Sequence, residues 1–258
     1  MIRAMKMRKA ASAAAFLCIV FAGGVGAVDS LPALLKAVDE AQRLPAPIRA
    51  DATVEIDGVE GSKRDHLVIV ERSVNEPKAA RQAYLELQNA KLRLLVLGPA
   101  DLQLASDGKA RPAKPDENVD STSFTAEDWL PFSPERCAAM RIADLGDAQF
   151  TLVCEPKKPP SQYSLMVYKF DREKAVMVQA LLYKDSMTNL VKMLRQDEFV
   201  QIGSTWRPKR IVVQDFKLRT KDVVSLDWQA APAVTGTLFD VKTFATAPLP
   251  QAAAAQKP

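Results

Sequence analysis

The spacing of apolar residues changes near the start of the chain, from a helical period to a strand period. Residues 30–45 carry leucine, valine and alanine three and four positions apart, as on one face of a helix. Ser30 or Asp29 is a suitable N-cap, and Pro45 ends the pattern. One amphipathic helix of about three turns is therefore predicted. Its apolar positions are Leu31, Leu34, Leu35, Val38 and Ala41.

From residue 49 onwards the period is two, as in a β-strand with one covered face. Residues 49–58 alternate apolar with polar side chains and end in an Asp57–Gly58 turn. Similar segments, separated by short polar turns, are residues 65–73, 81–89, 91–98, 101–112, 138–145, 148–155, 163–171, 175–185, 189–203, 207–220, 221–230 and 238–244. This pattern predicts an antiparallel meander. No fixed-length repeat occurs, which argues against propellers and solenoids.

Many of these strands are apolar on both faces. Runs of large apolar side chains occur at residues 67–70, 94–97, 165–167 and 176–182. An antiparallel sheet with one face in water should be polar on that face, so a second surface must cover these strands. A curved sheet with helices against its concave side would meet this requirement, and its interior would be a core or a cavity.

Residues 124–132, in the middle of the strand-rich part, have the pattern of a short helix. Thr125 is a candidate N-cap, and Asp128 three residues later completes a capping-box arrangement. Ser133–Pro134 stops the helix after about two turns. Glu127 and Asp128 are explained by capping and by the helix dipole, because adjacent helical residues diverge and do not form an acid–base pair.

The aromatic content of this short helix indicates that it docks on an apolar surface. Phe124 and Trp129 occupy the positions of a hydrophobic staple, and Leu130 and Phe132 add apolar area. So short a helix is not stable alone. Two interpretations remain open: a plug that completes the core, or a lid over a hydrophobic cavity, tied by the polar loop at residues 110–121.

The N-terminus has the features of a secretory signal peptide. Basic residues precede an uncharged apolar stretch from Ala10 to Val28, and small residues favour cleavage after Ala27. A retained transmembrane anchor is the alternative, since the stretch is just long enough. Cys18 lies inside the apolar stretch after Phe16-Leu17, which does not fit a lipid-modified cysteine.

Cleavage changes the charge of the chain. The complete sequence carries +4, but residues 1–27 contain four basic and no acidic side chains, which leaves 31 basic against 31 acidic residues. A nucleic-acid partner is therefore not indicated. Residues 28–246 suffice for one domain with a substantial core. Residues 247–258, rich in alanine, glutamine and proline, are expected to be a disordered tail.

Two cysteines remain after cleavage, Cys137 and Cys154. They flank two apolar runs around a plausible hairpin turn at Gly146–Asp147. In an oxidising compartment such a pair most simply forms a disulfide. A redox pair is the alternative, but the C-x-x-C spacing is missing.

Residues 124–132 and 163–216, with the N-terminal helix and the predicted curved sheet, resemble the LolA/LolB superfamily of periplasmic lipoprotein carriers and receptors. The chain is most similar to proteins labelled outer membrane lipoprotein-sorting protein, over roughly Leu31 to Phe244. The resemblance implies an α+β fold in which a strongly curved antiparallel sheet forms an unclosed β-barrel, with an N-terminal helix, a short mid-chain lid helix and an apolar interior that holds acyl chains.

Catalytic and cofactor motifs are absent from the sequence. No G-x-S-x-G, G-x-G-x-x-G, P-loop or H-E-x-x-H occurs. The single histidine, His66, lies in an apolar strand and is more simply a structural residue than a catalyst. We therefore expect no enzyme activity, no cofactor and no metal.

The expected function is that of a periplasmic monomer that binds acyl chains and moves a lipid or lipoprotein between membranes. An inner-membrane export complex or an outer-membrane receptor would be its protein partner. The candidate lipid contacts are Phe124, Trp129, Leu130, Phe132, Val54, Ile56, Leu85, Leu87, Leu94 and Val96. Strand parity alone assigns the last six, and a register error of one residue would turn them outward.

Alternatives exist for both the basic residues and the function. Arg207, Lys209, Arg210, Lys217 and Arg219 form a basic run that suits anionic lipid headgroups or an acidic partner. The same residues equally suit solvent-facing strands protected from edge pairing. A lipid-sensing regulatory module that partners a membrane protein is the second candidate function. A lipid-modifying enzyme would need His66 in a pocket beside an acidic residue and a serine or threonine.

Overall fold

The computed structural model describes residues 30–58, 61–74, 81–231 and 234–250 of the 258-residue chain. It contains one α-helix and three short 3₁₀ helices: α1 (Leu31–Gln42), η1 (Ala126–Trp129), η2 (Pro134–Arg136) and η3 (Gly236–Phe239). None of the described helices is long and apolar enough to cross a bilayer. The predicted signal peptide lies outside the described residues.

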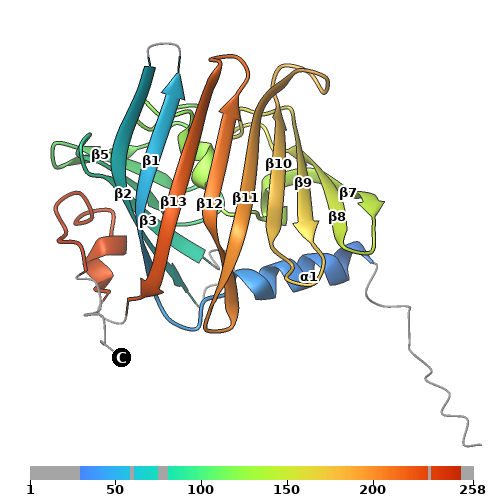
Figure 1. The fold of residues 1–258 in the computed structure, drawn as a ribbon, viewed down its shortest axis with the longest axis horizontal. Helices are drawn as coiled ribbons and strands as arrows, with labels where there is room; N and C mark the ends of the chain where they lie inside the picture. Colours follow the sequence, from blue (N-terminus) through green and yellow to red (C-terminus); the bar gives the residue numbers. More distant parts are fainter. Residues whose placement is uncertain (1–29, 59–60, 75–80, 232–233, 251–258) are drawn as a thin grey trace, which may run out of the picture.

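Thirteen strands form one antiparallel sheet (Figure 1). They are β1 (Ile48–Gly58), β2 (Gly61–Ser73), β3 (Arg81–Leu87), β4 (Leu92–Val96), β5 (Leu102–Ser106), β6 (Lys109–Pro112), β7 (Cys137–Leu145), β8 (Gln149–Pro156), β9 (Leu165–Asp171), β10 (Met177–Tyr183), β11 (Leu190–Ile202), β12 (Thr205–Asp215) and β13 (Thr220–Ala230). Strand alternation therefore predicted the architecture correctly. The predicted last strand at residues 238–244 is wrong, because η3 and turns occupy this segment.

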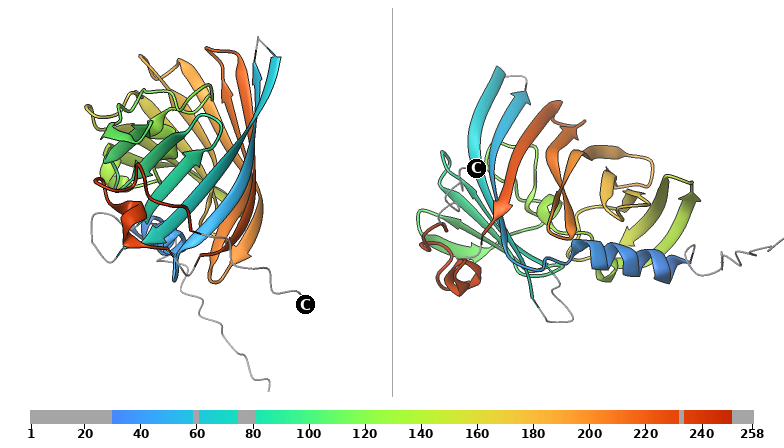
Figure 2. Two further views of the ribbon diagram at one scale, coloured as in Figure 1. Left: turned by 90° about the vertical axis from the view of Figure 1, so that its left-hand side faces the viewer. Right: turned by 60° about the horizontal axis from the view of Figure 1, so that its bottom comes forward.

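The strand order explains why the barrel is open. The order is β6-β5-β4-β3-β2-β1-β13-β12-β11-β10-β9-β8-β7, so β1 pairs with β13 and the edge strands are β6 and β7. These two edges are not paired with each other, and the sheet curves without closing (Figure 2). Residues 113–136, which we call the crossing segment, connect the two edges and carry η1 and η2. The mid-chain insertion is thus the link across the opening.

The helix α1 forms as its pattern predicts and lies across one end of the sheet (Figures 1 and 2). The Ser30 side chain accepts a hydrogen bond from the Ala33 backbone N–H at 3.4 Å. Leu34 and Val38 are buried on the concave side of the sheet. The helix therefore covers part of the concave face.

Of the strands that are apolar on both faces, β2 and β4 are covered on both sides, whereas Leu165, Val167 and Leu181 of β9 and β10 are only half-buried. In β2, Leu67 and Ile69 belong to the concave core, whereas Val68 and Val70 pack under the C-terminal segment on the outer face. The outer cover is formed by residues 236–249 rather than by further helices. Leu238, Phe239, Phe244 and Ala247 are its buried side chains.

This outer cover corrects the expected start of the disordered tail at residue 247. Ala247 is buried, Leu249 packs against the outer cluster, and Arg49 donates a hydrogen bond to the carbonyl of Pro250. The composition of the segment is polar and proline-rich, but its few apolar side chains find the apolar outer face of β2–β5. Residues 251–258 lie outside the described residues.

The predicted disulfide is present. Cys137 in β7 and Cys154 in β8 are bonded, with their Cα atoms 5.5 Å apart. The bond joins edge strand β7 to its only neighbour in the sheet, at the point where the crossing segment enters β7. It therefore holds one border of the opening.

Candidate functional site

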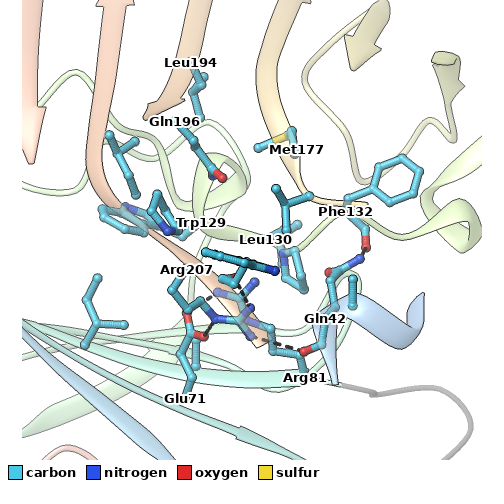
Figure 3. A pocket seen from close by; sticks show the side chains of 18 of the residues that line it. Gln42, Glu71, Arg81, Trp129, Leu130, Phe132, Met177, Leu194, Gln196 and Arg207 are labelled. Atoms are coloured by element: carbon cyan, nitrogen blue, oxygen red, sulfur yellow. Dashed lines mark hydrogen bonds and ion pairs between the residues drawn. The ribbon is translucent and has the colours of Figure 1, made fainter. Parts of the chain in front are cut away.

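A cavity of about 130 Å³ lies on the concave side of the sheet, between α1, the crossing segment and strands β2, β3 and β9–β13. Figure 3 shows the side chains that surround it. Most of them are apolar. The polar lining residues are Gln42, Glu71, Arg81, Asp128, Gln196 and Arg207.

The crossing segment enters the concave side through a capped 3₁₀ turn. The Asp128 carboxylate accepts a hydrogen bond from the Thr125 backbone N–H at 2.7 Å, as the capping box predicts. The turn is shorter than the two turns expected, because Pro131 holds the preceding residue, Leu130, in an extended conformation with ψ 134°. Residues 130–133 therefore run as an extended strap rather than as a helix.

Buried ion pairs fix the first half of this segment. Asp128 accepts hydrogen bonds from the Lys192 ammonium and the Tyr163 hydroxyl, both at 2.6 Å. Glu127, the neighbouring residue, pairs with Arg136 at 2.8 Å and accepts from the Ser161 hydroxyl at 2.6 Å. Burial, and then the Asp128 charge, raises the pKa of Tyr163 well above its usual value, so its hydroxyl stays a donor.

A second anchor ties the segment to β13. Asp222 is fully buried and accepts hydrogen bonds from the backbone N–H and the hydroxyl of Ser123. Burial raises the pKa of Asp222. Together with the Asp128 and Glu127 bonds, this contact fixes residues 122–128 in the core.

The second half, Trp129–Phe132, is held mostly by ring contacts. Trp129 stacks on Phe124 with ring centroids 4.4 Å apart, and Phe132 meets Tyr168 and Phe170 edge-on at 5.0 Å each. Unlike the buried Phe124, residues 129–132 are half-buried. We call Trp129–Phe132 the cover strap, because these residues line the cavity and are themselves partly exposed to solvent.

Charged side chains meet at one end of the cavity (Figure 3). Glu71 of β2 accepts hydrogen bonds from Arg81 of β3 and from Arg207 of β12 at 3.1 Å. Burial by itself would raise the pKa of Glu71, but the charges of Arg81 and Arg207 outweigh it and lower that pKa. Arg207 also donates to the carbonyl of Gln42 at the end of α1, at 3.2 Å.

The ten residues predicted to contact lipid all belong to the concave cluster. Leu85, Phe124, Trp129, Leu130 and Phe132 line the cavity. Val54, Ile56, Leu87, Leu94 and Val96 are buried in the same cluster outside the cavity lining. Strand parity therefore predicted correctly which side chains face the concave side. It gave no information on how far each of them lies from the cavity along its strand.

The basic run does not form one patch. Arg207 is buried at the cavity, whereas Lys209, Lys217 and Arg219 are exposed and Arg210 pairs with Asp197 at 3.2 Å. Arg207 and Lys209 are two positions apart on β12, yet the first is buried and the second is exposed, so the charges do not share one surface. Exposed and buried cations cannot be distinguished by counting charges along a sequence.

His66 lies on the outer face, away from the cavity. It is exposed and borders an open depression that also contains Asp51, Asp227, Thr53 and Ser225. Among the described residues, no hydrogen bond joins its imidazole to either carboxylate. No group of three or more potential metal ligands occurs in the described part of the chain.

Sequence analysis missed polar residues that line the cavity or hold the crossing segment. Glu71, Arg81, Lys192 and Tyr163 were not singled out. The signal was present for two of them: Glu71 continues the inward-facing series of Leu67 and Ile69, and Lys192 stands in phase with an apolar strand face. A charge at an inward position of an apolar strand is a candidate for a buried pair.

Comparisons with solved structures agree with this geometry. One relative is a domain described as an outer membrane lipoprotein-sorting protein from Vibrio parahaemolyticus, with a TM-score of 0.73, 12% identity and coverage of 82% of this chain and 97% of that one. A DUF1329 family protein from Desulfovibrio piger gives a TM-score of 0.69, 13% identity and coverage of 80% and 94%. A LolA superfamily protein from Nitrosomonas europaea gives 0.61, 15% identity and coverage of 81% and 96%.

No protein-family model and no curated protein matches the sequence. The identities to the solved structures are low, so the agreement concerns the course of the chain rather than its chemistry. Coverage of more than nine tenths of each relative shows that the whole domain corresponds. The chain therefore has the fold of the LolA superfamily and of the outer membrane lipoprotein-sorting domains.

Proposed function

We propose that this protein is a non-enzymatic carrier that holds an acyl chain of a lipid or lipoprotein in the concave cavity and moves it between membranes. The observation that carries the proposal is a mostly apolar cavity bordered by the half-buried cover strap. Burial of the chain would drive binding by roughly 0.8 kcal/mol per methylene group. The lipoprotein-sorting fold supports the same assignment.

The cavity is small, so in this proposal the cover strap has to move before a ligand can enter. A volume of about 130 Å³ is below the roughly 300–1,000 Å³ of ligand pockets, so an acyl chain would fit only after the cavity widens. Movement of Trp129–Phe132 would open the cavity toward solvent while the anchors at Asp128, Glu127 and Ser123 stay in place. The concave residues Val54, Ile56, Leu87, Leu94 and Val96 would then form the floor under a longer chain.

The compartment belongs to the same proposal. The basic N-terminus with its apolar stretch would direct export, with cleavage after Ala27. The Cys137–Cys154 disulfide fits an oxidising compartment such as the periplasm. An inner-membrane export complex or an outer-membrane receptor would be the donor or the acceptor of the lipid.

The test is native mass spectrometry of the mature protein purified from the periplasm, followed by extraction of bound material. We expect a bound lipid at unit stoichiometry, and a lower occupancy in Trp129→Asp. Leu145→Asp is the matched control, because Leu145 is an exposed apolar residue in the β7–β8 hairpin. A ligand-free mass with no uptake of added lipid or lipopeptide would show that the crossing segment is a permanent core plug.

A further inference from the structure

The charged end of the cavity contains more positive than negative charge. Glu71 is shared between Arg81 and Arg207, and the side chains of Glu71 and Arg207 are only 2% and 5% exposed. Asp128, the other charged residue of the lining, is neutralised by Lys192. The cluster of Glu71, Arg81 and Arg207 therefore carries a surplus of one positive charge at an otherwise apolar site.

Two buried donors at the same cavity lack acceptors. The Nε atom of Arg81 and the Nε1 atom of Trp129 are buried and have no hydrogen-bond partner within the described structure. Both residues line the cavity. Buried polar groups are nearly always paired, and an unpaired donor costs free energy that a ligand acceptor would recover. The cavity thus combines mostly apolar walls with two unpaired hydrogen-bond donors that an anionic ligand could satisfy.

The backbone fixes this arrangement. Arg81 is the first residue of β3 and pairs with Ser73 at the end of β2. Glu71 lies two positions before Ser73 and lines the cavity together with Ile69. Arg207 reaches the same place from β12 and is held by the carbonyls of Trp206 and Gln42. With Arg207 occupied by Glu71 and these carbonyls, Arg81 is the cation with spare donor capacity. Its side chain is 24% exposed, so a ligand head could reach it.

We propose that the cavity binds a single-chain amphiphile with a carboxylate head, a long-chain fatty acid, with the carboxylate on Arg81 and the chain along the cover strap. The inference rests on the proposed function and names its ligand class. A monoanion balances the surplus of one charge, whereas a doubly charged phosphate monoester would leave a buried negative charge. Because the cavity must widen before any chain can enter, a single chain needs a smaller displacement of the cover strap than the two chains and glycerol of a phospholipid.

The experiment compares ligands of equal chain length by isothermal titration calorimetry. Palmitate should bind the complete mature protein at least about tenfold more tightly than hexadecanol, since a charge-assisted hydrogen bond exceeds a neutral one. In Arg81→Gln the ratio of the two affinities should fall to about one, whatever the absolute affinity for hexadecanol becomes. Arg64→Gln, which alters an exposed arginine on β2, is the control and should keep the preference.

Each other outcome has a defined meaning. Equal binding of palmitate and hexadecanol, or a preference that persists in Arg81→Gln, overturns the carboxylate site and leaves the carrier intact. Tighter binding of a phosphodiester with the same chain, lysophosphatidylglycerol, overturns the choice of head. Binding of neither chain by the folded protein contradicts the carrier itself. If Arg81→Gln does not fold, Arg81→Lys keeps the charge, removes the Nε donor and should reduce the preference.

Discussion

At the scale of residues, buried ion pairs hold the crossing segment in place. Lys192 and Asp128 have side chains that are 4% and 0% exposed, so neither can be hydrated when its partner is lost. Asp128 also caps η1 and accepts from Tyr163. One carboxylate thus joins the start of the crossing segment to β11 and to the β8–β9 connection.

Removal of one partner of this pair should be costly. We expect Lys192→Met to lower the free energy of unfolding by about 3–5 kcal/mol, because Asp128 remains as an uncompensated buried charge. Urea unfolding followed by circular dichroism measures the change. Lys36→Met removes the exposed partner of Glu40 and should stay within about 0.5 kcal/mol of the wild type. A loss below 1 kcal/mol in Lys192→Met would show that water reaches Asp128.

Glu71 predicts the direction of a pH effect. Its pKa is lowered in the folded protein from an ordinary value of 4.5, so the folded state binds its proton less readily than the unfolded state. The stability from this group is present above pH 4.5 and is lost as pH falls toward the folded-state pKa. Urea midpoints at pH 7 and below pH 4.5 should therefore differ less in Glu71→Gln than in the wild type. An unchanged difference would exclude Glu71 as a contributor.

At the scale of elements, sequence patterns predicted the features that depend on residues close together in the chain. The α1 boundaries, the Thr125–Asp128 cap, the Phe124–Trp129 stack and most strands follow from capping groups and alternation. The errors arose where a distant surface decides. Residues 238–250 cover the outer face because they bury Val70, Tyr84 and Leu95. These three side chains are more than 100 positions earlier in the chain, so no local pattern reveals the contact.

The disulfide is the covalent tie of the β7–β8 hairpin and of the border of the opening. Its cysteines are 17 positions apart, so the chain-entropy estimate of its contribution is about 3 kcal/mol. We expect the double variant Cys137→Ser, Cys154→Ser to lose about this much in urea unfolding. Reductant should lower the wild-type midpoint and leave the variant unchanged. If reductant lowered the urea midpoints of the wild type and the variant equally, its effect would not come from this disulfide.

The whole molecule must cover both faces of an open sheet, and each face has its own solution. On the concave side, α1 and the crossing segment leave a small cavity between them. On the outer side, η3 and the residues after it pack against β2–β5. The outer cover supports β2 and β3 from outside, where their inner faces border the cavity, so these two strands would keep that support if the cover strap moved.

This division of roles predicts unequal effects of aromatic truncation on the two faces. Phe244 is fully buried in the outer cover, so Phe244→Ala should cost about 3–5 kcal/mol of unfolding free energy. Val241→Ala, at a 38% exposed position of the same segment, is the control and should change little. Phe132→Ala, in the half-buried strap, should cost less than Phe244→Ala but should speed lipid exchange between protein and vesicles. If Phe244→Ala instead changed exchange and left stability intact, the outer segment rather than the strap would be the mobile element.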